Sequence, residues 1–333
     1  MSAPGSDWRP SASAERLRQR AALLQRVRQF FAARAVTEVD TPLVVNAPVS
    51  DVHIHSATVR LAADPAGGAV SPPPLFLHTS PEYAMKRLLA AGSGDIYQIC
   101  HVVRGNERGR LHNPEFTLIE WYRVGFPLAQ LMDEVEALAR ALLGTAAPAA
   151  SERISFRDAF LRELALDPLT AEDAALARAA QPLALSAPAA TGAAVSRDDW
   201  LELLMGAIVG PRLGRGTLTF VHSYPATQAA LARLDAADPR VAERFELYCA
   251  GIELANGFHE LTAATEQRAR FEADNDRRRG LGLPVFPLDE RLLAALPSLP
   301  DSAGVALGFD RILMLAVGAA HIEEVLPFPT ARA

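Results

Sequence analysis

Two extended segments separated by only two residues constrain the fold more than any other feature of this sequence. They are 243–249 and 252–257, in the stretch ERFELYCAGIELANGFHELT. A turn near Cys249, Ala250 and Gly251 folds the two segments into a hairpin. We therefore expect an antiparallel sheet.

The rest of the chain predicts a sheet with helices on its faces. Leu17, Leu24 and Phe31 recur every seven residues, which is typical of an amphipathic helix over 15–35. No Gly-rich nucleotide-binding sequence of the Rossmann or P-loop type is present. The predicted class is α+β, not an alternating βαβ series. The other predicted elements are strands at 75–80, 95–104, 115–124 and 217–222, a helix at 128–143, and a short strand running into a helix in GVALGFDRILMLAVGAA.

Composition excludes several classes of protein. With 333 residues, 50% of them hydrophobic, the chain can bury a large core. Its net charge of −6 argues against general nucleic-acid binding. Two cysteines are too few for a disulfide framework, and no signal peptide or membrane-length apolar run occurs, so we expect a cytoplasmic protein. Lys86 is the only lysine, which we interpret as a mark of genome composition.

One domain, 14–333, is expected after a flexible N-terminal arm at 1–13 that is rich in Ser, Pro and Gly. The Ala- and Pro-rich stretches 144–151 and 181–194 are interpreted as surface connections. They flank a mostly helical insertion at about 150–213, in which we place no chemistry.

Alternation along 115–122 puts Glu120 on the same strand face as Phe116 and Tyr122. A buried carboxylate needs a partner, and a bound ammonium group would supply one. The alternative is that 115–122 is an edge strand and that the face with Glu120 is exposed to solvent.

Arginines gather in the loop that precedes this strand. Arg104, Arg108 and Arg110 would grip a phosphate with His112 as a further donor, or they belong to a solvated hairpin tip. Arg311, at a predicted helix start, would add an anion site, unless Asp310 and Arg311 only cap that helix.

The hairpin carries a pair of acidic residues, Glu246 and Glu253. Like charges that face each other across a hairpin invite a divalent cation, most plausibly Mg²⁺ held together with substrate phosphates. Two glutamates splayed to solvent are the alternative.

Three motifs in order resemble those of class II aminoacyl-tRNA synthetases. They are TPLV with Pro42 for motif 1, the arginine loop ending in HNPEFT for motif 2, and GVALGFDR for motif 3. HNPEFT together with ELANGFHELT resembles the lysyl branch. The resemblance covers the chain from about residue 14 and implies a six- or seven-stranded antiparallel sheet flanked by helices, in a homodimer.

Only a short arm stands where a lysyl-tRNA synthetase carries its anticodon-binding domain, so anticodon recognition is not expected. The stretches SPEYAMKRLL, HNPEFTLIEWYR, RVAERFELY and GIELANGFHELT resemble the family of ligases that attach (R)-β-lysine to elongation factor P. This implies activation of β-lysine with ATP and its transfer to a lysine of elongation factor P.

The resemblance also implies roles for single residues. Arg104 would hold the α-phosphate of ATP and Phe116 would stack on adenine, with Arg104 and Arg311 as the catalytic cations. Motif 2 usually reads Arg-x-Glu, whereas here Arg104-Gly105 is followed by Asn106 and then Glu107, either of which would supply the contact near adenine. The implied nucleotide and metal ligands are completed by His112, Asn113 and Arg311 for ATP, and by Glu246 and Glu253 for Mg²⁺.

The amino-acid pocket follows from the same resemblance. Glu82 would meet the backbone amine, with Ser80 beside it in the same motif, and Asn256 would meet the carboxylate. Ala306 stands where lysyl-tRNA synthetases have glycine, and its methyl group would favour the shifted amine of β-lysine by about 1–3 kcal/mol. The distal ammonium group would be bound by Glu120, Tyr122 and Glu260.

Other functions stay open on the sequence alone. One is a tRNA-independent enzyme that activates α-lysine for another acceptor, or that makes asparagine. Another is a silent paralogue, which Asn106 favours and the retained arginines and glutamates disfavour.

Overall fold

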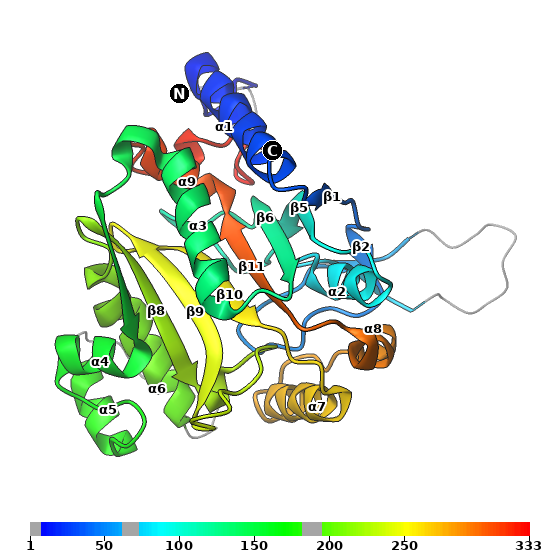
Figure 1. Cartoon of the computed structure of the whole chain (residues 1–333), viewed down its shortest axis with the longest axis vertical. Coiled ribbons are helices and arrows are strands. Elements are labelled where there is room, and N and C mark those ends of the chain that lie inside the picture. Colours follow the sequence, from blue (N-terminus) through cyan, green and yellow to red (C-terminus); the bar gives the residue numbers. More distant parts are fainter. Residues whose placement is uncertain (1–7, 62–72, 182–194) are drawn as a thin grey trace, which may run out of the picture.

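The computed structural model describes residues 8–61, 73–181 and 195–333. Its main element is an eight-stranded sheet, drawn in Figure 1, with the order β1-β5-β6-β11-β10-β9-β8-β7. In that order, the strands are β1 (Thr37–Glu38), β5 (Ile96–Val103), β6 (Glu115–Val124), β11 (Ser302–Gly308), β10 (Ile252–His259), β9 (Val241–Cys249), β8 (Thr217–Pro225) and β7 (Ala150–Ser155).

All neighbouring pairs from β5 to β8 are antiparallel, which confirms the predicted α+β class. The two edges differ from the expected sheet, because β1 pairs with β5 and β7 pairs with β8 in parallel. Strand β7 lies partly in a stretch that we interpreted as a surface connection. Its sequence, ASERIS, lacks the apolar alternation that marks a buried strand.

The predicted hairpin is present, with Ile252 opposite Cys249. Ala250 and Gly251 have φ angles of 53° and 75°, the left-handed conformation that a two-residue hairpin turn requires. A Cβ atom on Gly251 would lie 2.6 Å from the carbonyl oxygen of Pro211, so this position also needs glycine for space.

Helices α1 (Ala14–Ala32), α3 (Leu128–Leu143) and α9 (Phe309–Ala316) cover one face of the sheet, as Figure 1 shows. They bury its largest hydrophobic cluster, in which Phe31 of α1 stacks on Tyr97. Ser13 caps α1 by accepting a hydrogen bond from the backbone N–H of Arg16. The predicted helix α1 is present, but its buried residues are Leu23, Val27 and Phe31, whereas Leu17 of the predicted seven-residue spacing is exposed.

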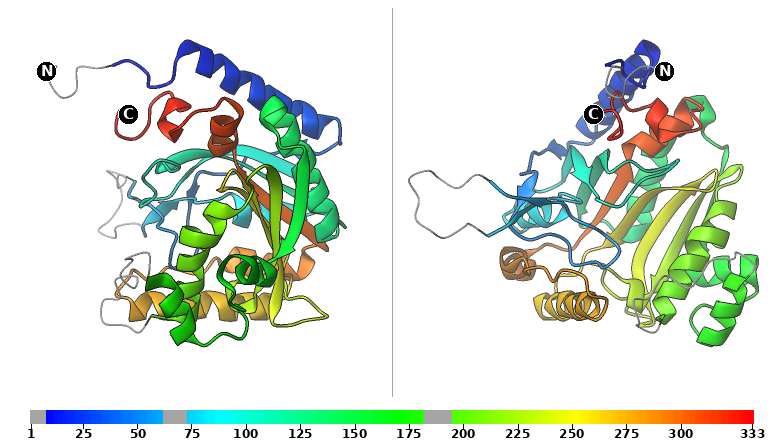
Figure 2. Two further views of the ribbon diagram at one scale, coloured as in Figure 1. Left: turned by 90° about the vertical axis from the view of Figure 1, so that its left-hand side faces the viewer. Right: turned by 180° about the vertical axis from the view of Figure 1, so that it is seen from behind.

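The opposite face is only partly covered. Helices α2 (Glu82–Ala90), α7 (Ala264–Gly280) and α8 (Glu290–Ala295) pack around a second cluster, and Figure 2 shows α7 and α8 below the sheet when the molecule is seen from behind. A small sheet lies beside them, made of β2 (Val44–Val45), β4 (Leu75–Leu77) and β3 (Thr58–Val59). The remainder of this face is left open to a cavity.

The expected insertion has its own hydrophobic cluster, packed against β8 and β9. It contains α4 (Phe156–Leu164), α5 (Asp173–Ala180), α6 (Arg197–Leu204) and a π-helical turn at Met205–Val209. Residues 182–194, most of the second expected connection, lie outside the described residues.

The N-terminal and C-terminal segments meet beside α1. Of the expected arm, residues 1–7 lie outside the described part, whereas Ser11 donates a backbone hydrogen bond to Pro327 and Ala12 is buried. In Figures 1 and 2 the blue α1 and the red C-terminal segment lie side by side. The end of the arm is thus docked on the domain.

Candidate active site

A cavity of about 1020 Å³ opens on the uncovered face of the sheet. Its floor is formed by β6, β9, β10 and β11, and its walls by α2, α7, the segment 42–54 and the loop between β5 and β6. The part around Glu82 and Glu120 is called the carboxylate end, and the part around Arg104, His112 and Arg311 is called the arginine end.

Glu120 lies at the carboxylate end, and the structure confirms its predicted face. Phe116, Glu120 and Tyr122 line the cavity, whereas Ile119 and Trp121 belong to the core on the other side of the sheet. Ser80 donates a hydrogen bond to Oε2 of Glu120 at 2.7 Å, and Tyr122 donates to Oε1 at 2.7 Å. The carboxylate is therefore buried and held from two sides.

The electrostatics of Glu120 suit a cationic ligand. Burial raises the pKa of Glu120 to about 7, and the charge of Glu82 contributes to this rise. The hydrogen bonds from Tyr122 and Ser80 oppose it by favouring the ionised form. A bound positive group would therefore stabilise the ionised form of Glu120.

Lys86 is a site residue that the sequence analysis missed. It follows Glu82 by one helical turn on α2, and its Nζ lies 2.6 Å from Oε1 of Glu82 and 2.5 Å from Oε2 of Glu260. Its being the chain's only lysine, four residues after an acidic residue of a predicted motif, was the available signal.

Glu260 does not lie where the resemblance implied. The side chain is fully buried, it is not among the residues that line the cavity, and its charge partner is Lys86. Burial raises the pKa of Glu260, and the Lys86 ammonium group opposes that rise. The structure thus places Glu260 behind the cavity wall.

Two small residues of β11 shape the floor between the carboxylates. A Cβ atom on Gly304 would lie 2.3 Å from Cε1 of Tyr122 and 2.6 Å from Oε1 of Glu260, so glycine makes room for both side chains. Ala306 pairs with Glu120 on one side and with Asn256 on the other. Its methyl group lies between the two predicted substrate contacts.

Asn256 is oriented by Arg244, a second residue that the sequence analysis missed. Nε of Arg244 donates to Oδ1 of Asn256 at 3.0 Å, which leaves the amide N–H groups of Asn256 for a ligand. Arg244 also donates to Glu246 at 2.6 Å and lies over the ring of Tyr224. The Asn256 amide therefore presents a donor to the cavity, as a carboxylate ligand requires.

Arg104, His112 and Arg311 gather at the other end, as predicted. Arg104 lies over Phe116, with its Cζ 5.2 Å from the ring centroid, and donates to Oε1 of Glu107 at 3.3 Å. Nη2 of Arg311 lies 2.6 Å from Nε2 of His112. Because a guanidinium group only donates, Nε2 of His112 must accept, and the ring is neutral.

The state of His112 follows from its surroundings. Burial and the charge of Arg311 lower the pKa of His112 below its ordinary value. Its Nε2 is used by Arg311 and so is no donor in this arrangement. The predicted role of His112 as a phosphate donor would have to use Nδ1.

The three remaining motif 2 residues differ in their placement. Glu107 lines the cavity, whereas Asn106 is exposed and does not. Asn113 also lines the cavity, but its amide donates to the carbonyl oxygen of Glu115 and accepts from the backbone N–H of Thr330. The side chain of Asn113 therefore holds the loop against the C-terminal segment, which differs from the implied role in ATP binding.

The acidic pair of the hairpin is unevenly exposed. The side chain of Glu253 is 41% exposed and lines the cavity, 3.6 Å from Arg311. Both oxygens of Glu246 accept hydrogen bonds at 2.6 Å, one from Arg244 and one from Tyr248. The register pairs Glu253 with Tyr248 and Glu246 with Asn256, so the two glutamates do not stand directly opposite each other as predicted. Burial, and after it the charge of Glu246, raises the pKa of Glu253.

Asp310, at the start of α9, does not cap the helix, so the alternative prediction is wrong. No side chain caps this helix; instead Oδ2 of Asp310 accepts the backbone N–H of Thr117 at 2.6 Å. Arg20 of α1 forms an ion pair with the same carboxylate and donates to Oγ1 of Thr117. Helix α1 is thereby tied to the floor of the cavity.

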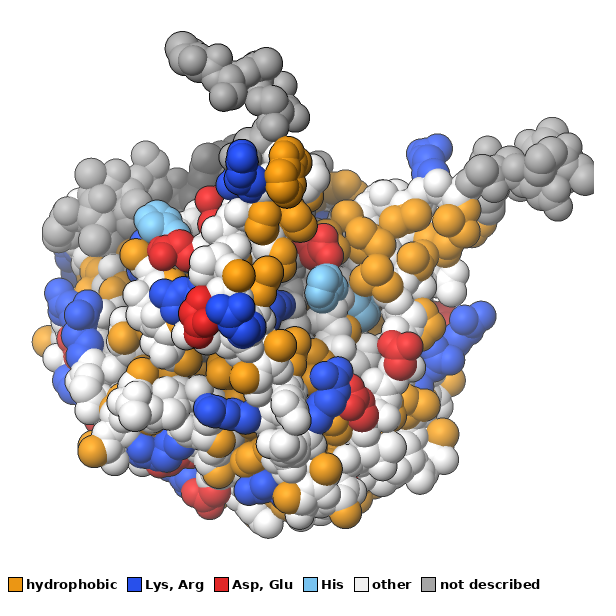
Figure 3. All heavy atoms as spheres, turned by 90° about the horizontal axis from the view of Figure 1, so that it is seen from above, with side chains coloured by type: hydrophobic (Ala, Val, Ile, Leu, Met, Phe, Trp, Pro, Cys, Tyr) orange, Lys and Arg blue, Asp and Glu red, His pale blue; other side chains and the backbone are white. Residues whose placement is uncertain are grey.

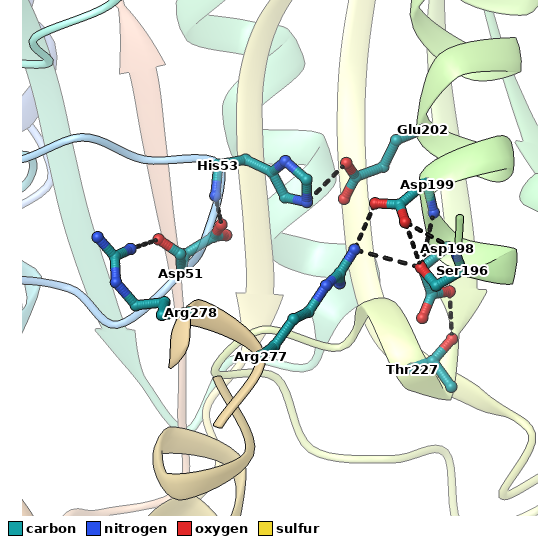
Figure 4. Close-up of polar contacts among 9 residues, drawn as sticks. All are labelled: Asp51, His53, Ser196, Asp198, Asp199, Glu202, Thr227, Arg277 and Arg278. Atoms are coloured by element: carbon teal, nitrogen blue, oxygen red, sulfur yellow. Dashed lines mark hydrogen bonds and ion pairs between the residues drawn. The ribbon is translucent and has the colours of Figure 1, made fainter. Parts of the chain in front are cut away.

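The rim of the cavity is a network of charges on three segments, shown in Figure 4. His53 lies 3.1 Å from Glu202 on α6, and Arg277 of α7 forms an ion pair with Asp199. Arg278, also of α7, donates to the carbonyl oxygen of Asp51 at 2.8 Å. The segment 50–54 is thus held over the cavity by the insertion and by α7.

Three properties of the described residues concern metal binding, membrane spanning and surface charge. No group of three or more His, Cys, Asp and Glu side chains lies close enough together to hold a metal ion in this part of the chain. No helix there is long and apolar enough to cross a membrane. Figure 3 shows positive and negative side chains interspersed on the face seen from above, without a field of basic residues.

Comparisons with known proteins give matches over nearly the whole chain. Residues 5–332 match the family of class II tRNA synthetases (D, K and N). Relatives named elongation factor P–(R)-β-lysine ligase cover nearly the whole chain. That of Vibrio cholerae serotype O1 is 49% identical over 98% of this chain and 99% of its own length, and that of Vibrio vulnificus is 50% identical over 97% and 98%. The relative from Salmonella typhi is 48% identical over 98% of both chains.

Proposed function

The chain belongs to the class II tRNA synthetase family, within the group of elongation factor P–(R)-β-lysine ligases, and we propose that it activates (R)-β-lysine with ATP and transfers it to a lysine of elongation factor P. One observation carries the proposal: a single cavity joins a carboxylate end to an arginine end. Such a cavity suits a substrate with ammonium groups that reacts with a phosphate.

The carboxylate end would bind the amino acid. Glu120, with Tyr122 beside it, would accept hydrogen bonds from the distal ammonium group, and Glu82 from the other one. The free amide N–H groups of Asn256 would donate to the substrate carboxylate, which directs that carboxylate toward Arg104. Ala306, between Glu120 and Asn256, would set the distance between the two contacts.

The arginine end would bind ATP. Phe116 offers a ring face for adenine, although Arg104 lies over that ring in this structure. Arg104 would hold the α-phosphate, and Arg311 with His112 the outer phosphates. Between the two motif 2 candidates, we propose Glu107 for the contact near adenine, because it lines the cavity.

In the first step, an oxygen of the β-lysine carboxylate attacks the α-phosphorus of ATP. The bond between that phosphorus and the bridging oxygen to the β-phosphate breaks, which gives β-lysyl-adenylate and pyrophosphate. Negative charge grows at the α-phosphate, and Arg104 and Arg311 are preorganised to stabilise it. The chain's contribution is therefore positioning and charge stabilisation.

Glu246 and Glu253 would hold Mg²⁺ with the phosphates of ATP. Their carboxylates offer the hard oxygen ligands that Mg²⁺ prefers. Burial, and after it the charge of Glu246, raises the pKa of Glu253, and a bound cation would lower this pKa. Mg²⁺, when bound, would screen the charge of the phosphates. The proposed site would supply only two carboxylates, which suits an ion that keeps several ligands from phosphate and water.

In the second step, the neutral amine of the acceptor lysine attacks the carbonyl carbon of the adenylate. An amide bond forms, AMP leaves, and the amine loses a proton. The acceptor would enter past the rim of the cavity, where His53, Glu202 and Arg277 lie.

We further propose that the protein is cytoplasmic and forms a homodimer. The homodimer is proposed because the class II resemblance assigns dimer contacts to motif 1, and sedimentation equilibrium tests it.

Amino-acid-dependent exchange between ATP and labelled pyrophosphate tests the proposal. The purified protein with Mg²⁺ should exchange with (R)-β-lysine far better than with α-lysine or aspartate. A preference for α-lysine would replace β-lysine in the proposal, and no exchange with any of the three would indicate a silent paralogue. Arg104→Ala should abolish exchange while leaving the circular dichroism spectrum unchanged.

A further inference from the structure

The only lysine of the chain lies inside the protein between two carboxylates. Lys86 is 1% exposed, and its Nζ is 2.6 Å from Glu82 and 2.5 Å from Glu260. Burial lowers the pKa of Lys86, but the charges of Glu260 and Glu82 outweigh this and raise the pKa. The side chain therefore stays charged in the interior.

Its two partners lie on different sides of the cavity wall. Glu82 is 16% exposed and lines the cavity, whereas Glu260 is fully buried behind it. The aromatic ring of Phe258 lies 5.1 Å from the Lys86 ammonium group and lines the cavity beside it. Lys86 thus links a carboxylate that faces the substrate to one that does not.

Other charged groups act on this cluster from the neighbouring elements. Glu120 and Tyr122 of β6 interact electrostatically with Glu82, and Lys86 lowers the pKa of Glu120 against the effect of burial. Helix α8 also packs on α2, but through apolar side chains, and its own charges are exposed at Glu290 and Arg291. The cluster therefore contains three carboxylates and one cation.

We propose that Lys86 is a positioning residue for the amino-acid pocket: it supplies the counter-charge for Glu260 and fixes Glu82 from behind. Glu82 and Glu120 then remain as the two carboxylates of this cluster that face the cavity, which matches a substrate with two ammonium groups. This inference rests on the proposed function. Lys86 itself would touch neither substrate nor ATP.

The KM for β-lysine as a function of pH tests the charge of Lys86 directly. Lys86→Met keeps the length of the side chain and removes the cation. The carboxylates that face the cavity should then stay protonated up to a higher pH. We expect the pH at which affinity for β-lysine is half lost to rise by about one unit, which raises KM about fivefold at pH 7. The KM for ATP should not change, and KM for β-lysine should recover near pH 9.

Lys86→Arg keeps the cation and should keep the wild-type midpoint. An effect of packing alone would change KM in Lys86→Met without moving the midpoint, and that result would overturn the proposal. Arg123→Met is a matched control, because Arg123 is a buried cation paired with Asp95 and Glu134 on the opposite face of the sheet. It should lower stability without moving the midpoint.

A double variant keeps the proposal testable if the single variant folds poorly. Lys86→Met leaves Glu260 buried without a counter-charge, whereas adding Glu260→Gln removes that charge. At pH 8 we expect the double variant to regain at least half of the Tm that Lys86→Met loses. A double variant no more stable than the single one would contradict the pairing.

The two kinds of measurement also separate this inference from the proposed function. If the wild-type protein exchanged pyrophosphate with no diamino acid, the proposed function would fail. The Tm values of Lys86→Met, Lys86→Arg and the double variant would still show whether Lys86 and Glu260 act as a pair. Normal exchange by the wild type with an unmoved pH midpoint in Lys86→Met would remove only the inference.

Discussion

The carboxylate of Asp310, at the start of α9, accepts the backbone N–H of Thr117, in the middle of the sheet, at 2.6 Å. The two residues are 193 positions apart in the chain. Arg20 of α1 binds both, through an ion pair with Asp310 and a hydrogen bond to the Thr117 hydroxyl group. Motif 3, motif 2 and the first helix therefore meet at one buried carboxylate.

Removing this carboxylate should destabilise the fold strongly. Asp310→Ala leaves the Thr117 N–H and the Arg20 guanidinium group without their partner, so we expect the free energy of unfolding to fall by about 3–5 kcal/mol. Urea unfolding followed by fluorescence measures the change. Glu15→Ala, which breaks an exposed ion pair with Arg18 on α1, should leave the midpoint unchanged. Equal effects of the two substitutions would contradict the assignment.

Glu120→Gln should weaken binding of β-lysine and spare ATP. A charged hydrogen bond contributes about 1.5–3 kcal/mol, so KM for β-lysine should rise about 10- to 100-fold in pyrophosphate exchange. Glu115→Gln is the matched control, because Glu115 lies on the same strand but pairs with His101 at the surface. Similar kinetics for both variants would argue against Glu120 as a substrate ligand.

Affinity for β-lysine should depend on pH in the same range. Burial raises the pKa of Glu120 to about 7, so acidification below pH 7 protonates the carboxylate that the ammonium group needs. KM for β-lysine should therefore rise by up to about tenfold per pH unit below 7 and level off above it. The step should disappear in Glu120→Gln, and its persistence there would assign it to another group.

Gly304→Ala tests the close packing under the pocket. The added Cβ atom would lie 2.3 Å from Tyr122 and 2.6 Å from Glu260, which forces both side chains to move. We expect a loss of about 1–3 kcal/mol of stability together with a higher KM for β-lysine. Gly206→Ala, where no atom lies within 4 Å of the added carbon, should behave like the wild type. Differential scanning calorimetry and exchange kinetics measure the two effects.

The motif 2 alternative can be decided by two substitutions in one loop. Glu107→Gln should raise KM for ATP, because Glu107 lines the cavity and holds Arg104, whereas Asn106→Ala should leave it within about twofold. Titration of both variants with ATP at saturating β-lysine compares them. A large effect of Asn106→Ala would reverse the assignment.

Much of this fold could be predicted because its signals are local. Alternation along β6 identified the face of Glu120, and the two-residue turn after Cys249 identified the hairpin. Helical periodicity found α1, and the motifs in order indicated the class II family. The strand, turn and helix signals each lie within a short run of neighbouring residues, whereas the order of the motifs extends over most of the chain.

The features that sequence reasoning missed depend on contacts between distant segments. The role proposed for Lys86 depends on its ion pair with Glu260, which forms only when α2 packs beside the end of β10. Arg244 gains its role from Asn256 on the adjacent strand, and Asp310 from Arg20 on α1. The edge strand β7 is partly exposed, so no periodic apolar pattern marked it. A single sequence does not contain these distances.

The burial of Lys86 also bears on what the enzyme can do to itself. In an enzyme of the proposed activity, an activated acyl group is made beside the place where a foreign amine attacks it, and any accessible lysine of the enzyme would compete. The chain has one side-chain amine of this kind, and folding encloses it between two carboxylates. Its other long basic side chains are arginines, whose guanidinium groups keep their proton and do not act as nucleophiles. The protein thus presents no lysine on its surface for self-acylation.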